Sequence, residues 1–138
     1  MRVDVGLTHI ALDAIDIDAS IKFYADYVNM CVIHERVDKE IGMRVVWLSD
    51  RTRPFVIVLL QNKTPSIILK PLAHLGVGCI SKEEVTKLCD KARIENILVR
   101  EPQESGYPIG YWALLKDPSG HTIELSYGQE IGLTVENS

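Results

Sequence analysis

The chain has 138 residues, of which 46% are apolar and 25% charged, the composition and length of one globular domain with a real core. Fifteen basic and 19 acidic side chains give a formal net charge of −4, which excludes a broad positive surface for nucleic acid. No apolar run approaches the ~18 residues of a membrane span, and the three cysteines lack CxxC spacing. We therefore expect a cytoplasmic protein that binds neither nucleic acid nor membrane.

The first half of the chain predicts one strand, one helix and three further strands. Residues 5–13 form the first expected strand, and Asp16 or Asp18 can cap the helix that follows. Asn29 is suited to end that helix in the left-handed conformation. The apolar stripe of the helix has the spacing of one helical face and comprises Ile21, Tyr24, Tyr27 and Val28. The three expected strands span residues 31–37, 43–49 and 55–61.

The second half predicts the same succession of elements. A strand over residues 72–80 precedes a helix that begins with a capping box, Ser81 to Glu84. The buried stripe of this helix comprises Val85, Leu88, Cys89 and Ala92. Three more strands are expected over residues 97–100, 110–115 and 121–127.

The two halves resemble each other when the sequence is compared with itself. The matches keep one order at an offset of 65 residues, and at 66 near the end, which indicates two copies of a unit of about 60 residues. They place Thr8–Leu12 on Ala73–Val77, Trp47 on Trp112, and Ile57–Leu60 on Ile123–Ser126. The prediction is an α+β fold in one domain, residues 1–138, made of two tandem βαβββ modules over about 5–62 and 70–128.

Strand alternation predicts which side chains share a face. His9 points to the face opposite Ile10 and Leu12, and His74 occupies the matching position in the second module. Glu124 lies on the polar face of the last strand. Two imidazoles and one carboxylate can bind a divalent metal and leave positions open for substrate oxygens. A satisfied histidine within a strand is the ordinary alternative for each imidazole taken alone.

Four segments resemble the vicinal oxygen chelate superfamily, which includes glyoxalase I, bleomycin and fosfomycin resistance proteins, extradiol dioxygenases and methylmalonyl-CoA epimerase. They are Thr8–Leu12, Asp18–Asp26, Ala73–Val77 and Asp117–Leu125, the last being the most specific because an Asp-Pro-x-Gly turn leads into the glutamate strand. The resemblance covers residues 7–127. It implies a cupped mixed sheet with helices on its outer face and one divalent ion, Fe, Mn, Ni or Zn, held by His9, His74 and Glu124.

The chain departs from several members of that family at their second functional residue. The additional glutamate of glyoxalase I falls on Val58, or on Leu59 in the other register. A fosfomycin-transferase threonine falls on Ala11, and the dioxygenase tyrosine falls on Leu114. The extra dioxygenase histidine falls on Leu60.

Other polar and aromatic side chains can complete a site. Glu35 and Tyr111 are the candidate catalytic acid–base groups, and His34 is a further candidate base. Arg44 can bind a substrate carboxylate. The expected substrate-binding set is His34, Arg44, Trp47 and Trp112. His121 lies an odd number of positions before Glu124 in the same expected strand, so its side chain points to the opposite face. We therefore expect His121 to be structural.

The sequence thus favours a metal-dependent enzyme that binds a small oxygenated molecule through two oxygens, with glyoxalase-like lyase or isomerase chemistry. An Fe(II) extradiol-type dioxygenase is one alternative. A binding protein of the bleomycin-resistance type, which sequesters a small molecule without catalysis, is the other. The resemblance also implies a homodimer.

Overall fold

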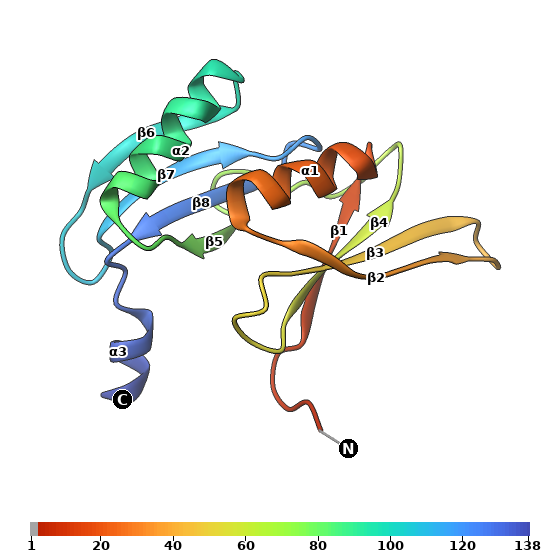
Figure 1. Ribbon diagram of the computed structural model, residues 1–138, viewed down its shortest axis with the longest axis horizontal. Coiled ribbons are helices and arrows are strands. Elements are labelled where there is room, and N and C mark those ends of the chain that lie inside the picture. Colours follow the sequence, from red (N-terminus) through yellow and green to blue (C-terminus); the bar gives the residue numbers. More distant parts are fainter. Residues whose placement is uncertain (1–2) are drawn as a thin grey trace. The chain divides into compact units, whose positions relative to one another are not determined.

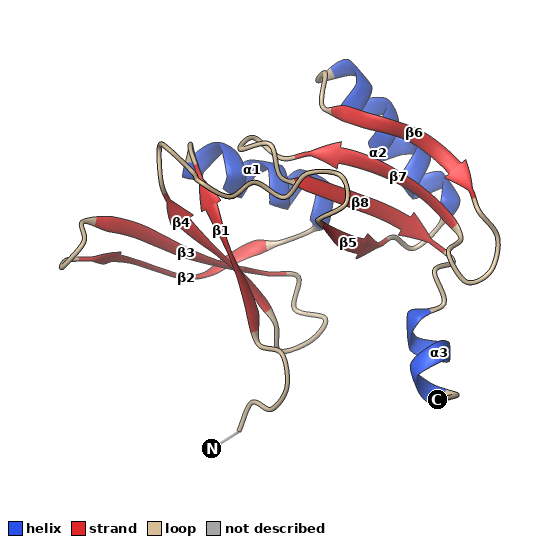
Figure 2. Ribbon diagram, turned by 180° about the vertical axis from the view of Figure 1, so that it is seen from behind, coloured by secondary structure: helices blue, strands red, loops and turns tan. Residues whose placement is uncertain are grey.

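The structure is a computed structural model that describes residues 3–138, and the chain divides into two compact units. The first unit extends to Ile68 and the second begins at Leu69. Each unit contains a four-stranded sheet and a helix of at least three turns (Figures 1 and 2). None of the helices within residues 3–138 is long and apolar enough to cross a membrane.

The first unit is a βαβββ module. Its sheet has the strand order β1-β4-β3-β2, in which β1 and β4 are parallel and the other pairs antiparallel. The elements are β1 (His9–Ala14), α1 (Ile17–Val28), β2 (Cys31–Asp38), β3 (Met43–Ser49) and β4 (Val56–Gln61). Four strands and a helix therefore form where the sequence predicts them, with ends shifted by a few residues.

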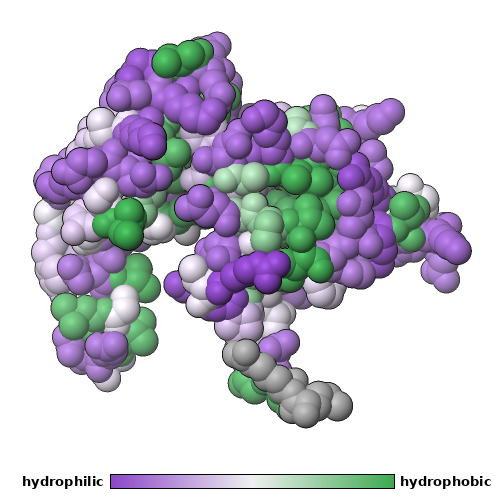
Figure 3. Space-filling model, in the orientation of Figure 1, coloured by the Kyte–Doolittle hydropathy of each residue, from purple (hydrophilic) through white to green (hydrophobic). Residues whose placement is uncertain are grey.

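The second unit repeats this topology and adds a short helix. Its sheet order is β5-β8-β7-β6, and β5 and β8 are the parallel pair. The elements are β5 (His74–Gly78), α2 (Lys82–Ile94), β6 (Leu98–Glu104), β7 (Tyr111–Lys116), β8 (Thr122–Tyr127) and α3 (Ile131–Glu136). The α+β fold of two βαβββ modules is confirmed, whereas α3, whose apolar side chains are exposed, is not among the predicted elements (Figure 3).

The helix ends follow from capping side chains that the sequence displays. Asp16, one of the two predicted caps, accepts a hydrogen bond from the backbone N–H of Ala19 at 3.1 Å. Asn29 ends α1 with φ of 57°, a conformation that asparagine tolerates. The Ser81 hydroxyl accepts from the backbone N–H of Glu84 at 3.0 Å, so the predicted start of α2 is confirmed.

The paired strands define the equivalent positions of the two units. Ala11, two residues after His9, pairs with Val58, and Gly76, two residues after His74, pairs with Glu124. Val58 is therefore the counterpart of Glu124, which selects the first of the two registers that the sequence left open.

The same pairing corrects one match of the internal repeat. Trp47 pairs with Val58, whereas its counterpart beside Glu124 is Leu114. Trp112 pairs with Ser126 instead. Placing Trp47 on Trp112 is therefore wrong by two residues, because the connection between the preceding strands differs in length in the two modules.

The core of the first unit fixes which face of its sheet is covered by α1. The strands bury alternate residues, namely Leu12, Ala14, Val46, Leu48, Ile57 and Leu59, and β3 also buries Val45 and Ser49 at intervening positions. From α1, Phe23 stacks on Tyr27 at 4.9 Å between ring centroids and meets Tyr24 edge-on at 5.1 Å. His9 lies an odd number of positions before Leu12 and Ala14, which places it on the opposite face of the sheet.

Candidate functional site

His74 and Glu124 lie close together on adjacent parallel strands of the second unit. Their Nε2 and Oε2 atoms are 3.5 Å apart. The Glu124 side chain is about nine-tenths buried, and that of His74 is 35% exposed. Two donors bound to one ion at about 2.1 Å lie roughly 3.0–3.4 Å apart at octahedral or tetrahedral angles, so the pair fits two ligands of one metal.

Two neighbours of this pair shape its surroundings. Gln129 donates from Nε2 to the other carboxylate oxygen of Glu124 at 3.2 Å, which orients the carboxylate. Gly76 faces Glu124 across the strand pair, and a Cβ added there would meet no atom within 4 Å. Gly76 therefore leaves open space beside the carboxylate of Glu124.

His9 has matching chemistry in the first unit. Its Nδ1 lies 2.9 Å from the Thr8 hydroxyl, and within residues 3–138 its Nε2 has no hydrogen-bond partner. When Nδ1 donates to the hydroxyl, the Nε2 lone pair is available to a metal, the usual arrangement for a ligating histidine. Within those same residues the structure shows no cluster of three or more His, Cys, Asp or Glu side chains, so the three-residue ligand set stays a prediction.

Three side chains of β2 and β3 share the His9 face of the first sheet. Trp47 and His34 are paired across the strands, and their rings lie 4.7 Å apart. The Arg36 guanidinium lies 5.9 Å from the Trp47 ring centroid, and its Nη1 donates to His34 Nε2 at 3.1 Å. The expected substrate-binding residues His34 and Trp47 are thus brought together on one face.

Glu35 and Arg44 lie on the opposite face of that sheet. Arg44 donates to Glu35 at 2.9 Å and to Asp18 of α1 at 2.9 Å. These hydrogen bonds raise the pKa of Arg44, and the two acids occupy its guanidinium. Alternation explains the separation, because each residue is an odd number of positions from His34 or Trp47 along its own strand.

Tyr111 and Trp112 separate in the same way in the second unit. The Tyr111 hydroxyl lies 3.0 Å from that of Thr86 on α2, so this ring is on the helix-covered face. Trp112 shares the face of Glu124, donates from Nε1 to Ser105 at 2.8 Å and lies under the Arg100 guanidinium at 5.0 Å. Of these two candidates, only Trp112 lies on the face of the sheet that carries His74 and Glu124.

His121 is a structural residue, as predicted. It is 1% exposed, and its Nδ1 accepts a hydrogen bond from the backbone N–H of Leu69 at 3.0 Å. The backbone N–H of His121 donates to the Asp117 carboxylate at 3.0 Å, and that carboxylate also accepts from the backbone N–H of Ser119 at 2.8 Å. His121 therefore connects the two segments: its backbone binds the Asp-Pro-Ser-Gly turn, and its imidazole binds the segment that precedes β5.

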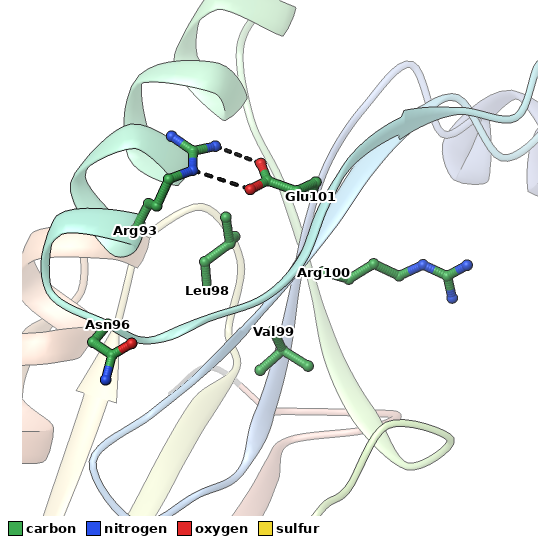
Figure 4. Close-up of a pocket in the computed structure, with 6 residues that line it drawn as sticks. All are labelled: Arg93, Asn96, Leu98, Val99, Arg100 and Glu101. Carbon is green, nitrogen blue, oxygen red and sulfur yellow. Dashed lines mark hydrogen bonds and ion pairs between the residues drawn. The ribbon is translucent and has the colours of Figure 1, made fainter.

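Two pockets are found outside the ligand pair. One, of about 160 Å³, lies between α2 and β6; Arg93 and Glu101 in its lining form an ion pair, and Arg100 points away from them (Figure 4). The pairing lowers the pKa of Glu101 and raises that of Arg93, which is expected of a structural contact. The other, of about 560 Å³, lies wholly in the first unit and is lined by His9 and Trp47.

Sequence reasoning missed several residues that the geometry brings to these places. Gln129 follows the last strand and has no motif that would mark it. Arg36, Arg53 and Phe55 line the larger pocket, although each alone is an ordinary exposed or half-buried residue. Only the folded first unit shows that they line the same pocket as His9.

Comparisons with known proteins agree with this geometry. Residues 6–125 match the profile of the Glyoxalase/Bleomycin resistance protein/Dioxygenase superfamily. The chain is 36% identical over 129 residues to "Uncharacterized protein PA2024" of Pseudomonas aeruginosa, covering 91% of each chain. It is 28% identical to a "Probable lactoylglutathione lyase" of Vibrio parahaemolyticus, covering 94% of this chain and 96% of that one.

Solved structures share the fold. Leishmania major glyoxalase I superposes with a TM-score of 0.73 at 24% identity, covering 97% of this chain and 94% of that one. The fosfomycin resistance protein FosX of Listeria monocytogenes superposes with a TM-score of 0.71 at 18% identity, covering 90% and 94%.

Proposed function

The chain belongs to the Glyoxalase/Bleomycin resistance protein/Dioxygenase superfamily, and on that premise we propose that it is a divalent-metal-dependent enzyme acting on a small oxygenated molecule. The ligands are His74 and Glu124 of the second unit with His9 of a first unit, from the same chain or a second copy. The metal is Fe, Mn, Ni or Zn, since imidazole and carboxylate donors suit all four.

The observation that carries the proposal is the His74–Glu124 pair. Burying a carboxylate is expensive unless a cation or several hydrogen bonds compensate for it, and Glu124 has one amide donor and one imidazole. A divalent ion between the two side chains would supply the missing compensation. Gln129 would then orient the ligand carboxylate from the second coordination shell.

When bound, the ion would act as a Lewis acid that polarises two substrate oxygens. The protein would contribute position and exclusion of water: Val58 and Trp47 give the His9 face an apolar surface, and open space at Gly76 admits a substrate beside Glu124. Of the sequence-predicted proton acceptors, His34 shares the face of His9. We assign proton transfer to His34 and leave Glu35 and Tyr111, on the helix-covered faces, outside the site.

Glyoxalase-like lyase or isomerase chemistry is the reaction class we favour, since two relatives carry the name "Probable lactoylglutathione lyase". The test is isomerisation of the hemithioacetal of methylglyoxal and glutathione, followed by thioester absorbance, after EDTA treatment and reloading with each of the four metals. Turnover should need a metal and disappear in His74→Ala and Glu124→Gln, while Glu35→Gln, on the other face of its sheet, should retain it. Turnover that survives EDTA and both ligand variants would overturn the proposal.

A non-catalytic binding protein is the second candidate. The observation that favours it is Val58, which stands where the symmetry of the fold would place a second carboxylate opposite Glu124. Metal uptake without turnover of the hemithioacetal or of a catechol would support this candidate over both the lyase and the Fe(II) dioxygenase. The homodimer and the cytoplasmic location stay predictions.

A further inference from the structure

A cavity of about 560 Å³ opens on the His9 face of the first unit. Its volume falls in the range of small-molecule sites, about 300–1,000 Å³. Its lining includes two cations, Arg36 and Arg53, and two aromatic side chains, Trp47 and Phe55. This combination of cations and apolar rings at one cavity carries the inference.

The two guanidiniums are available to a ligand. Within residues 3–138, neither Arg36 nor Arg53 forms an ion pair with a carboxylate, in contrast to Arg44 and Arg93. Asp4 is the one acidic side chain in the lining, so two cations and one anion leave a net charge of +1, His9 apart. A guanidinium binds a carboxylate through two parallel hydrogen bonds, which suits a monoanionic partner.

The remaining surface of the cavity suits an apolar group of moderate size. Trp47 is 36% exposed, and its ring contacts the His34 ring at 4.7 Å and the Arg36 guanidinium at 5.9 Å. Phe55 and Val58 extend this apolar surface along β4 and the residue before it. A flat hydrocarbon group placed against the Trp47 ring would bury area on both partners.

We propose that this cavity binds a small organic monocarboxylate whose flat apolar body lies against Trp47 and Phe55 while Arg36 and Arg53 hold the carboxylate. Because His9 lines the same cavity, this assigns a substrate class to the proposed enzyme, and that extension rests on the proposed function. The binding itself depends only on residues of the first unit.

The test is calorimetric titration of the EDTA-treated full chain with 2-naphthoate, with its neutral amide 2-naphthamide and with acetate. Naphthoate should bind at least about 10-fold more tightly than either comparison ligand, because naphthamide lacks the charge that the guanidiniums bind and acetate lacks the apolar body that packs against Trp47. Arg53→Gln and Arg36→Gln should each weaken naphthoate binding about 10-fold or more. Arg51→Gln is the matched control, since Arg51 lies two residues from Arg53 and donates to Cys31 Sγ at 3.4 Å outside the cavity lining.

Equal affinity for naphthoate and naphthamide would overturn the inference, as would an equal loss in Arg51→Gln and Arg53→Gln. Repeating the titration with His74→Ala separates this inference from the proposed function. Naphthoate binding that persists in His74→Ala and in a chain that takes up no metal would support the anion site and refute the metalloenzyme. Metal-dependent turnover together with equal binding of naphthoate and naphthamide would support the metalloenzyme and refute the anion site.

Discussion

Replacing His121 by alanine tests the separation of structural from ligand histidines. The imidazole is 1% exposed and accepts the backbone N–H of Leu69 at 3.0 Å. Leaving that donor without its partner costs about 1–3 kcal/mol. The cavity left by a buried side chain of this size adds about 2 kcal/mol. We therefore expect His121→Ala to lower the free energy of unfolding by about 3 kcal/mol or more, and the melting temperature by about 10 °C.

The assay is urea denaturation of the EDTA-treated proteins, so that bound metal does not contribute to the measured stability. His34→Ala is the control, because its half-buried ring loses only an exposed hydrogen bond to Arg36 and a contact with Trp47, worth about 1 kcal/mol. Metal binding by His121→Ala at low urea should match that of the wild type. A variant that unfolds with the wild-type midpoint but has lost its metal would refute the structural assignment of His121.

Two further predictions concern thiol reactivity and backbone conformation. Burial raises the pKa of Cys79 and of Cys89 to about 11. At pH 8 only the exposed Cys31 should therefore react rapidly with a disulfide reagent, and Cys79 should gain reactivity as the pH approaches 11. Rapid reaction of all three thiols in folded protein at pH 8 would contradict this prediction. Gly110 has φ of +80°, and an added Cβ would lie 2.5 Å from a backbone carbonyl oxygen at the end of β8, so Gly110→Ala should cost about 3 kcal/mol or more of stability. Gly106→Ala, at φ of +71° with open space around it, should cost only about 1 kcal/mol in the same denaturation experiment, and equal losses would contradict the steric argument.

Local signals predicted most of the fold because they act within a few residues. A side-chain cap such as Asp16 or Ser81 satisfies backbone donors of its own helix, so the sequence alone locates the helix start. The internal repeat predicted two modules because both copies show the same order of matching residues and the same alternation of polar and apolar side chains along their strands. The tail helix α3 was missed because its apolar residues are exposed and have no burial pattern.

The candidate site was harder to predict because it depends on which face each strand turns to the helix. Alternation shows that Glu35 cannot share a face with its neighbour His34, but not which of them faces α1. The irregular pairing between Val32 and His34 shifts the register at that point, and only the paired strands reveal it. Arg36 and Arg53 escaped notice because an exposed arginine most often lies on an ordinary solvated surface, and the cavity that joins them is a tertiary feature.

The most direct test of the account is the metal content of the chain, measured by elemental analysis after purification without added metal and after incubation with Fe, Mn, Ni or Zn. The wild type should hold about one ion per chain, and Gln129→Ala should bind it about 10–100-fold more weakly. His74→Ala and Glu124→Gln should lose the ion, whereas His34→Ala should keep it. A wild-type chain that takes up none of the four metals, or a His74→Ala variant that holds as much as the wild type, would contradict the central claim.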